Sequence, residues 1–177
     1  MLRRLIEQMS GIYTGATVKL HTSTSLQCMG LAGEEIVDDR VWVVKAHHPG
    51  LMPGVIQFNS QKTICCVRNP IDVIVSFATL INTLSHTAQP EYEYHTDFPE
   101  WWDWWVKKQS ADMKRYFDTL LRHCRDEGKN PIYIVRFEDL LKDKQGELEG
   151  VMKYLLDMDS LEGTNAQRRI EQITNCD

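Results

Sequence analysis

The chain has 177 residues, of which 42% are hydrophobic, and a formal net charge of −5 at pH 7. This length and composition predict one α/β domain with a single buried core over residues 1–177. The acidic balance argues against nucleic acid as the main partner, because proteins that bind phosphate backbones present a basic surface. No apolar run is long enough to span a bilayer, and the five cysteines lack the CxxC spacing of a zinc or redox site, so we expect no metal.

The first part of the chain predicts a helix followed by a long connection. Residues 1–9 have the amphipathic pattern of a helix, and residues 11–15 read as a helix stop and a turn. Residues 13–39 read as a loop-rich stretch, of the kind that often builds a substrate pocket.

Three apolar, β-rich runs predict strands that each end in ionisable side chains. The three ends read Lys45-Ala46-His47-His48-Pro49, Arg68-Asn69-Pro70 and Arg136-Phe137-Glu138-Asp139-Leu140. In open parallel α/β sheets, ligands bind outside the carboxyl ends of the strands. We therefore expect the three ends to share one cleft.

Helices are predicted at residues 71–84, 99–125, 145–156 and 161–170, with a loop at 85–99. The long helix carries four tryptophans within residues 101–105, and these cannot all face one way because successive helical residues differ by about 100°. Packing in the core and stacking on a sugar ring are the two interpretations of these side chains.

The second strand end has the layout of an anion site. A helix that begins near Pro70 directs unpaired backbone N–H groups and the positive end of its dipole beyond the strand. The planar guanidinium of Arg68 suits bidentate binding of phosphate. Ser76 lies about two turns into this helix, so only an arched loop or a long ligand would bring it to the same phosphate. The alternative is an ordinary strand end with a solvated arginine.

These motifs resemble the sulfotransferases that use 3'-phosphoadenosine 5'-phosphosulfate (PAPS) as donor. The segment from Arg68 to Ser76 is similar to the family's 3'-phosphate-binding motif. Residues 45–49 are similar to its Lys-Thr-His-x-Pro strand end, and residues 136–140 to its Arg-Tyr-Glu-Asp-Leu segment. The resemblance covers roughly residues 1–157 and implies a three-layer α/β/α fold with a central parallel sheet, like that of P-loop NTPases. The implied reaction is sulfuryl transfer from PAPS to a hydroxyl or amine, with no metal.

The resemblance also implies a role for each matching residue. His47 would take the proton from the acceptor hydroxyl, a task that imidazole suits near neutral pH, and His48 is the alternative base. Lys45 would stabilise charge on the transferring sulfuryl group or on the leaving phosphate. Arg68 and Ser76 would hold the 3'-phosphate.

The chain departs from the family pattern at several places. Ala46 replaces a threonine, and Phe137, a candidate nucleotide-binding residue, replaces a tyrosine, so each position lacks a hydroxyl. The family's first strand and its Ser-Gly-Thr/Asn-Thr-Trp loop, which holds the 5'-phosphosulfate, have no counterpart before the helix at 1–9. We therefore expect a truncated domain in which neighbouring strands lack a partner. The family's Arg-Lys-Gly loop is not recognised either, because Arg168 and Arg169 lack the following glycine.

Three functional hypotheses follow from these residues. The first is a sulfotransferase that acts on a hydroxyl of a carbohydrate, tyrosine, steroid or phenol. The second is a non-catalytic, sulfotransferase-derived module that binds a nucleotide or another protein. The third is a P-loop kinase-like enzyme, which would need a Gly-rich loop with Lys-Ser/Thr and a magnesium-binding aspartate that the sequence does not show. The sequence is compatible with the cytoplasm or, given an upstream anchor, with the Golgi lumen.

Overall fold

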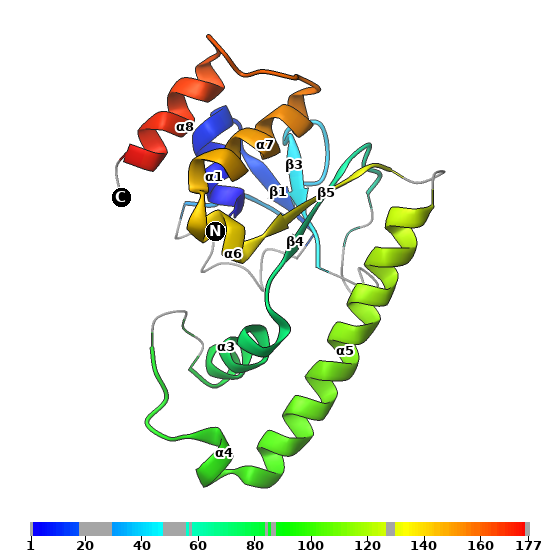
Figure 1. The fold of residues 1–177 in the computed structure, drawn as a ribbon, viewed down its shortest axis with the longest axis vertical. Coiled ribbons are helices and arrows are strands. Elements are labelled where there is room, and N and C mark those ends of the chain that lie inside the picture. Colours follow the sequence, from blue (N-terminus) through cyan, green and yellow to red (C-terminus); the bar gives the residue numbers. More distant parts are fainter. Residues whose placement is uncertain are drawn as a thin grey trace.

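The structure is a computed structural model that describes residues 2–17, 30–47, 56, 58–83, 85, 88–126 and 130–175. Among the described residues, one helix is followed by four strands, three helices, a fifth strand and three further helices; Figure 1 shows their arrangement. In chain order the elements are α1 (Leu2–Ser10), β1 (Thr14–Ala16), β2 (Gly33–Glu34), β3 (Val43–Lys45), β4 (Thr63–Val67), α3 (Pro70–Thr83), α4 (Tyr94–Asp97), α5 (Pro99–Arg125), β5 (Ile132–Arg136), α6 (Phe137–Lys142), α7 (Lys144–Leu156) and α8 (Asn165–Asn175).

All the described strands pair in parallel, which confirms the mixed α/β architecture. They form two sheets, one with the order β2-β1-β3 and one with β4 beside β5. Thr63 of β4 pairs with Ile132 of β5, and this register runs without interruption to Val67 and Arg136. Among the described residues, one edge of β3 and one edge of β4 therefore have no strand partner.

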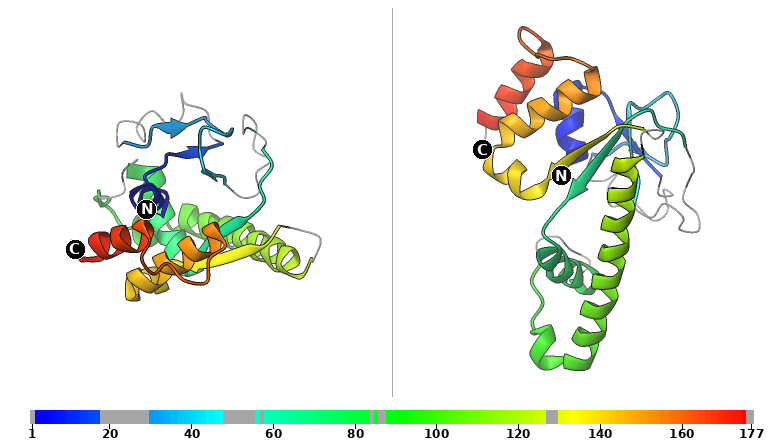
Figure 2. Two further views of the ribbon diagram at one scale, coloured as in Figure 1. Left: turned by 90° about the horizontal axis from the view of Figure 1, so that it is seen from above. Right: turned by 45° about the vertical axis from the view of Figure 1, so that its right-hand side comes forward.

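Helices cover both faces of the β4–β5 pair, which gives three layers. Ile64 packs against the main core, whose buried members come from α1, α6, α7, α8 and β5. The next residue, Cys65, points to the opposite face, where its Sγ lies 2.6 Å from the hydroxyl oxygen of Tyr116 on α5. Figure 2 shows α5 on one side of these strands and α1, α7 and α8 on the other.

A second, smaller core lies where α3 and α4 meet the first turns of α5, away from the strands (Figure 1). Trp105 is buried here, and its indole N–H donates to the backbone oxygen of Ile74 at 3.1 Å. Trp101 stacks on Trp105 with ring centroids 5.5 Å apart. Trp104 is 55% exposed, so the tryptophans divide between core and surface as the helical geometry requires.

Two predictions of local structure were wrong. The stretch 13–39 contains β1 and β2, and the loop predicted at 85–99 contains the short helix α4. These two strands were not predicted because both contain glycine, which has low strand propensity. Glycine is needed because a Cβ at Gly15 would lie 2.0 Å from the backbone oxygen of Ile36, and one at Gly33 would lie 2.1 Å from that of Thr14.

The other predicted elements are present, with their ends moved by a few residues. Gly11 ends α1 in the left-handed conformation, with φ of 73°. The long helix runs from Pro99 to Arg125 as predicted, whereas the last one begins at Asn165 instead of residue 161. In the part of the chain that the structure describes, no helix is long and apolar enough to cross a membrane.

Candidate active site at the strand ends

The carboxyl end of β3 carries the two residues predicted to act on the transferred group. Lys45 is the last residue of β3 and is half-buried, and His47 follows two residues later and is exposed. Loss of water contact lowers the pKa of Lys45, and the nearby Arg3 charge adds to this effect, while Glu34 opposes it. Desolvation also lowers the pKa of the His47 imidazole, with a further contribution from Lys45. His48, the alternative base, lies outside the described residues.

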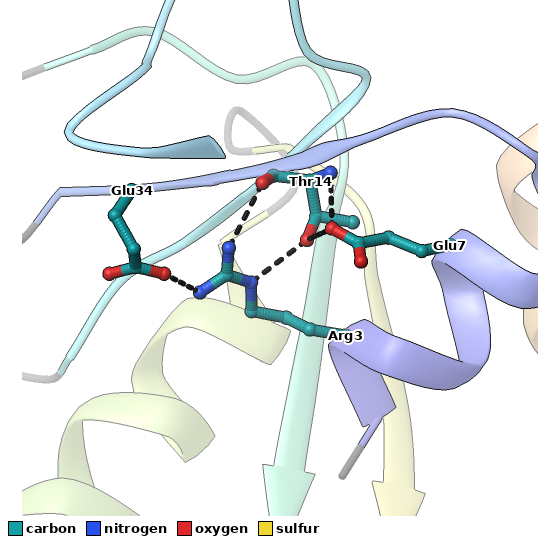
Figure 3. Close-up of polar contacts among 4 residues, drawn as sticks. All are labelled: Arg3, Glu7, Thr14 and Glu34. Atoms are coloured by element: carbon teal, nitrogen blue, oxygen red, sulfur yellow. Dashed lines mark hydrogen bonds and ion pairs between the residues drawn. The ribbon is translucent and has the colours of Figure 1, made fainter. Parts of the chain in front are cut away.

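A network of charges joins α1 to β1 and β2, the strands that precede β3, as Figure 3 shows. Arg3 of α1 forms an ion pair with Glu34 of β2, and their side chains are only 10% and 1% exposed. The Arg3 guanidinium also donates to the hydroxyl and the backbone oxygen of Thr14, each at 2.9 Å. Glu7 accepts hydrogen bonds from the backbone N–H of Thr14 at 2.8 Å and from its hydroxyl at 2.7 Å. The network fixes α1 on the sheet.

The ends of β4 and β5 bring together two of the predicted donor-binding residues. Arg68 follows β4 directly, and its guanidinium carbon lies 4.6 Å from the centre of the Phe137 ring at the start of α6. Arg68 is half-buried, and its Nε is fully buried with no hydrogen-bond partner in the part of the chain that the structure describes. A planar cation stacked on a ring keeps a defined orientation, so this guanidinium presents its donors in a fixed plane.

The start of α3 differs from the open anion site that the sequence predicts. The side-chain oxygen of Asn69 caps the helix by accepting from the N–H of Ile71 at 3.0 Å. The N–H of Asn69 itself donates to the Glu138 carboxylate at 2.6 Å, and this bond lowers the pKa of that carboxyl. Two backbone donors at the start of this helix, the N–H groups of Asn69 and Ile71, are thus used within the protein, so the Arg68 side chain becomes the main candidate to donate hydrogen bonds to a phosphate.

The predicted site residues fall into separate groups. Arg68 and Phe137 are in contact, and Lys45 and His47 share the end of β3 in the other sheet. Ser76 lies on an exposed part of α3, and no hydrogen bond among the described residues joins it to Arg68. Two shallow hollows on the described surface are lined by residues of α1 with Gly30 and Leu31, and by residues 163–171; neither contains a predicted site residue.

Sequence reasoning missed three charged residues beside the site. Arg3 and Glu34 meet through a contact between residues 31 positions apart, and Glu138 reaches Asn69 across 69 positions. Glu138 could have been identified from the sequence, because it is part of the segment that resembles Arg-Tyr-Glu-Asp-Leu. The sequence pattern did not indicate a role for Glu34, because β2 itself was not predicted.

Comparison with curated proteins and with solved structures gives no significant match. The family described as the sulfotransferase domain matches residues 38–168. This span is well over half of the 177 residues, and it contains β3, β4 and β5 with all five predicted site residues. The chain belongs to the sulfotransferase domain family.

Proposed function

We propose that this chain binds PAPS at the ends of β4 and β5 and transfers its sulfuryl group to a hydroxyl acceptor at the end of β3. Family membership supports the class of reaction. The donor site rests mainly on the Arg68 guanidinium, which is stacked on Phe137 and whose buried Nε has no hydrogen-bond partner among the described residues.

The Arg68 side chain fits the 3'-phosphate of the donor. A buried polar atom without a partner costs about 1–3 kcal/mol, and such atoms are rare in folded proteins unless a ligand, water or ion satisfies them. Phosphate oxygens form charge-assisted, often bidentate hydrogen bonds with a guanidinium, and a small shift of the half-buried Arg68 side chain would bring its Nε within reach of one. Ser76, exposed on α3, would add a hydroxyl donor to the same phosphate. Phe137 would hold the guanidinium plane while the phosphate binds.

Lys45 and His47 supply the chemistry at the other strand end. PAPS provides a sulfuryl group on a good leaving phosphate, so the bond from sulfur to the acceptor oxygen forms as the bond to the phosphate oxygen breaks. His47 removes the proton from the acceptor hydroxyl, and its lowered pKa keeps the imidazole in the neutral, proton-accepting form at pH 7. The Lys45 ammonium stabilises the negative charge that accumulates on the leaving oxygen.

The donor site is tested by calorimetric titration of adenosine 3',5'-bisphosphate into the protein and into Arg68→Ala. Loss of a charge-assisted hydrogen bond costs about 1.5–3 kcal/mol, so the dissociation constant should rise roughly 12- to 150-fold. Arg40→Ala is the matched control, because it removes the same charge at an exposed loop position that pairs with Asp38. Equal affinity of Arg68→Ala and the unchanged protein would refute the site.

One structural observation favours a second candidate, a module that binds the nucleotide without transfer. The two groups of site residues belong to different sheets, and the proposed reaction requires the ends of these sheets to act on one bound molecule. Incubation with PAPS and a panel of phenol, sugar and tyrosine-peptide acceptors separates the candidates. Sulfated product that disappears in His47→Gln supports the enzyme, whereas tight bisphosphate binding without product for any acceptor supports the module.

A further inference from the structure

The register of the three-stranded sheet places Glu34, Ala16 and Lys45 in one row. Ala16 of β1 pairs with Glu34 on one side and with Lys45 on the other. Residues paired across parallel strands point to the same face, and adjacent strands lie about 4.8 Å apart, so the backbones of β2 and β3 are separated by roughly 10 Å. Ala16 is small and 1% exposed. The two long, oppositely charged side chains therefore extend over the same face, with Ala16 between their strands and the Arg3 guanidinium paired with Glu34.

The Glu34 carboxylate is held in place on this face. Its side chain is 1% exposed and is ion-paired with Arg3, and Arg3 is oriented by two further hydrogen bonds to Thr14 (Figure 3). Buried ion pairs contribute little net stability, because the desolvation of both charges offsets their attraction. Stability alone therefore does not account for a buried glutamate that is separated from Lys45 by the single strand β1.

We propose that Glu34 is a positioning residue for the reaction: its carboxylate, fixed by Arg3, sets the charge balance of Lys45 and His47 at the end of β3. The role in catalysis rests on the proposed function, while the charge coupling itself does not. In this arrangement Arg3 orients Glu34, and Glu34 acts on the groups that would touch the donor and the acceptor.

The charges around the strand end determine the sign of the effect. Lys45 feels the positive Arg3 of α1 and the negative Glu34 of β2. His47 feels the positive Lys45 of β3 and the negative Glu34. Glu7, the acidic residue of α1, is also part of this network, where its carboxylate accepts hydrogen bonds from Thr14. Because a nearby anion favours the protonated form of a base, removing the Glu34 charge should lower the pKa of both Lys45 and His47.

The test is a titration of the His47 imidazole by NMR, with its signal assigned from His47→Gln. In Glu34→Gln the pKa of His47 should fall by about 0.25–0.5, which is the effect of one charge roughly 12 Å away at an effective dielectric constant of 40–80, since His47 lies two residues beyond Lys45. Glu7→Gln is the matched control, since it makes the same chemical change in the same network while keeping an oxygen acceptor for Thr14. An unchanged His47 pKa in folded Glu34→Gln, or an equal fall in Glu7→Gln, would overturn the proposal.

A second variant covers the case in which Glu34→Gln does not fold, because it leaves the Arg3 cation buried without its partner. The double substitution Arg3→Glu/Glu34→Arg keeps an ion pair but reverses its polarity. The charge on β2 then becomes positive, so the double variant should lower the His47 pKa as well, and an unchanged value overturns the coupling.

The rate of transfer gives the functional readout. With His47 as the base and Lys45 as the required cation, both limbs of the pH–rate profile should move to lower pH in Glu34→Gln, whereas a purely structural role would reduce the folded fraction without moving the limbs. The NMR titration needs neither donor nor acceptor. A protein that transfers no sulfuryl group would refute the proposed function, and it would leave the result on Glu34 coupling to be judged from the titration alone.

Discussion

Substitution of Phe137 by leucine measures what the aromatic ring under Arg68 contributes to donor binding. The guanidinium carbon lies 4.6 Å from the ring centre, and the Nε of the same group is buried. Such cation–π contacts are worth about 0.5–1 kcal/mol at exposed sites and about 2 kcal/mol when desolvated. Because this contact exists before the donor binds, its loss weakens binding by leaving the Arg68 side chain to be ordered on binding, at a cost of about 0.5–1.5 kcal/mol, which corresponds to a dissociation constant for adenosine 3',5'-bisphosphate about 2- to 12-fold higher.

The assay is isothermal calorimetry on the unchanged protein, Phe137→Leu and Phe137→Tyr, each shown to be folded by urea unfolding. Phe137→Tyr keeps the ring and restores the residue found in the resembling family motif, so its affinity should equal or exceed that of the unchanged protein. If Phe137→Leu binds as tightly as the unchanged protein while Arg68→Ala loses binding, the ring does not orient the guanidinium and the argument from stacking fails.

Three further predictions concern packing and pH. Gly150→Ala places a Cβ 2.1 Å from the hydroxyl oxygen of Tyr133. The cost of overpacking, about 1–3 kcal/mol, should exceed the gain in helix propensity of about 1 kcal/mol, so the substitution should lower the free energy of unfolding. In a Tyr133→Phe background, which lacks this hydroxyl, urea unfolding should instead show Gly150→Ala to be neutral or stabilising. Leu148→Ala, at a fully buried position, should lower the free energy of unfolding by about 2–5 kcal/mol in the same assay. The transfer rate should rise with pH through the pKa of His47, which lies below its ordinary value of 6.5; a rate that still rises steeply above pH 7.5 would argue against His47 as the base.

Local sequence was enough to predict the strand ends that carry the candidate site. The runs that became β4 and β5 are continuous and apolar, and each is followed directly by a charge and then by a helix start. Such patterns depend on neighbours within a few residues, which are visible in a single sequence. The contact between Arg68 and Phe137 then follows from the parallel register, because Val67 and Arg136, the residues just before them, are paired.

The three-stranded sheet was harder to predict, because its strands are short and two of them contain glycine where backbones approach closely. Gly15 and Gly33 are paired across β1 and β2, and both lack the β-branched or aromatic side chains by which a strand is recognised. The close approach that requires glycine is a tertiary property, since the obstructing oxygens belong to other segments. Consequently the ion pair between Arg3 and Glu34 could not be predicted either.

The capping of α3 shows a second limit of sequence reasoning. A helix start after an arginine indicates an anion site only if its backbone donors are free. Here Asn69 supplies its own cap, which its residue type permits. The carboxylate of Glu138, which follows the neighbouring strand β5, also accepts a hydrogen bond from the Asn69 N–H. That contact depends on the parallel alignment of β4 with β5. The alignment places the turns that follow the two strands at the same end of the sheet, although they are far apart in the sequence.

The two halves of the proposed site are fixed by different forces, and the difference matches what each half must do. Arg68 is oriented by packing on a ring, and one of its donors has no partner among the described residues, as an anchor for an anion requires. Lys45 and His47 are instead governed by charges of both signs, with Glu34 opposing the cations around them. A base and an electrostatic stabiliser depend on proton affinity more than on a single rigid contact. Substitutions at Arg68 and Phe137 should therefore change donor affinity with little effect on pH dependence, whereas Glu34→Gln should change pH dependence with little effect on donor affinity. A variant set in which both quantities always changed together would show that the two strand ends do not act as separate parts.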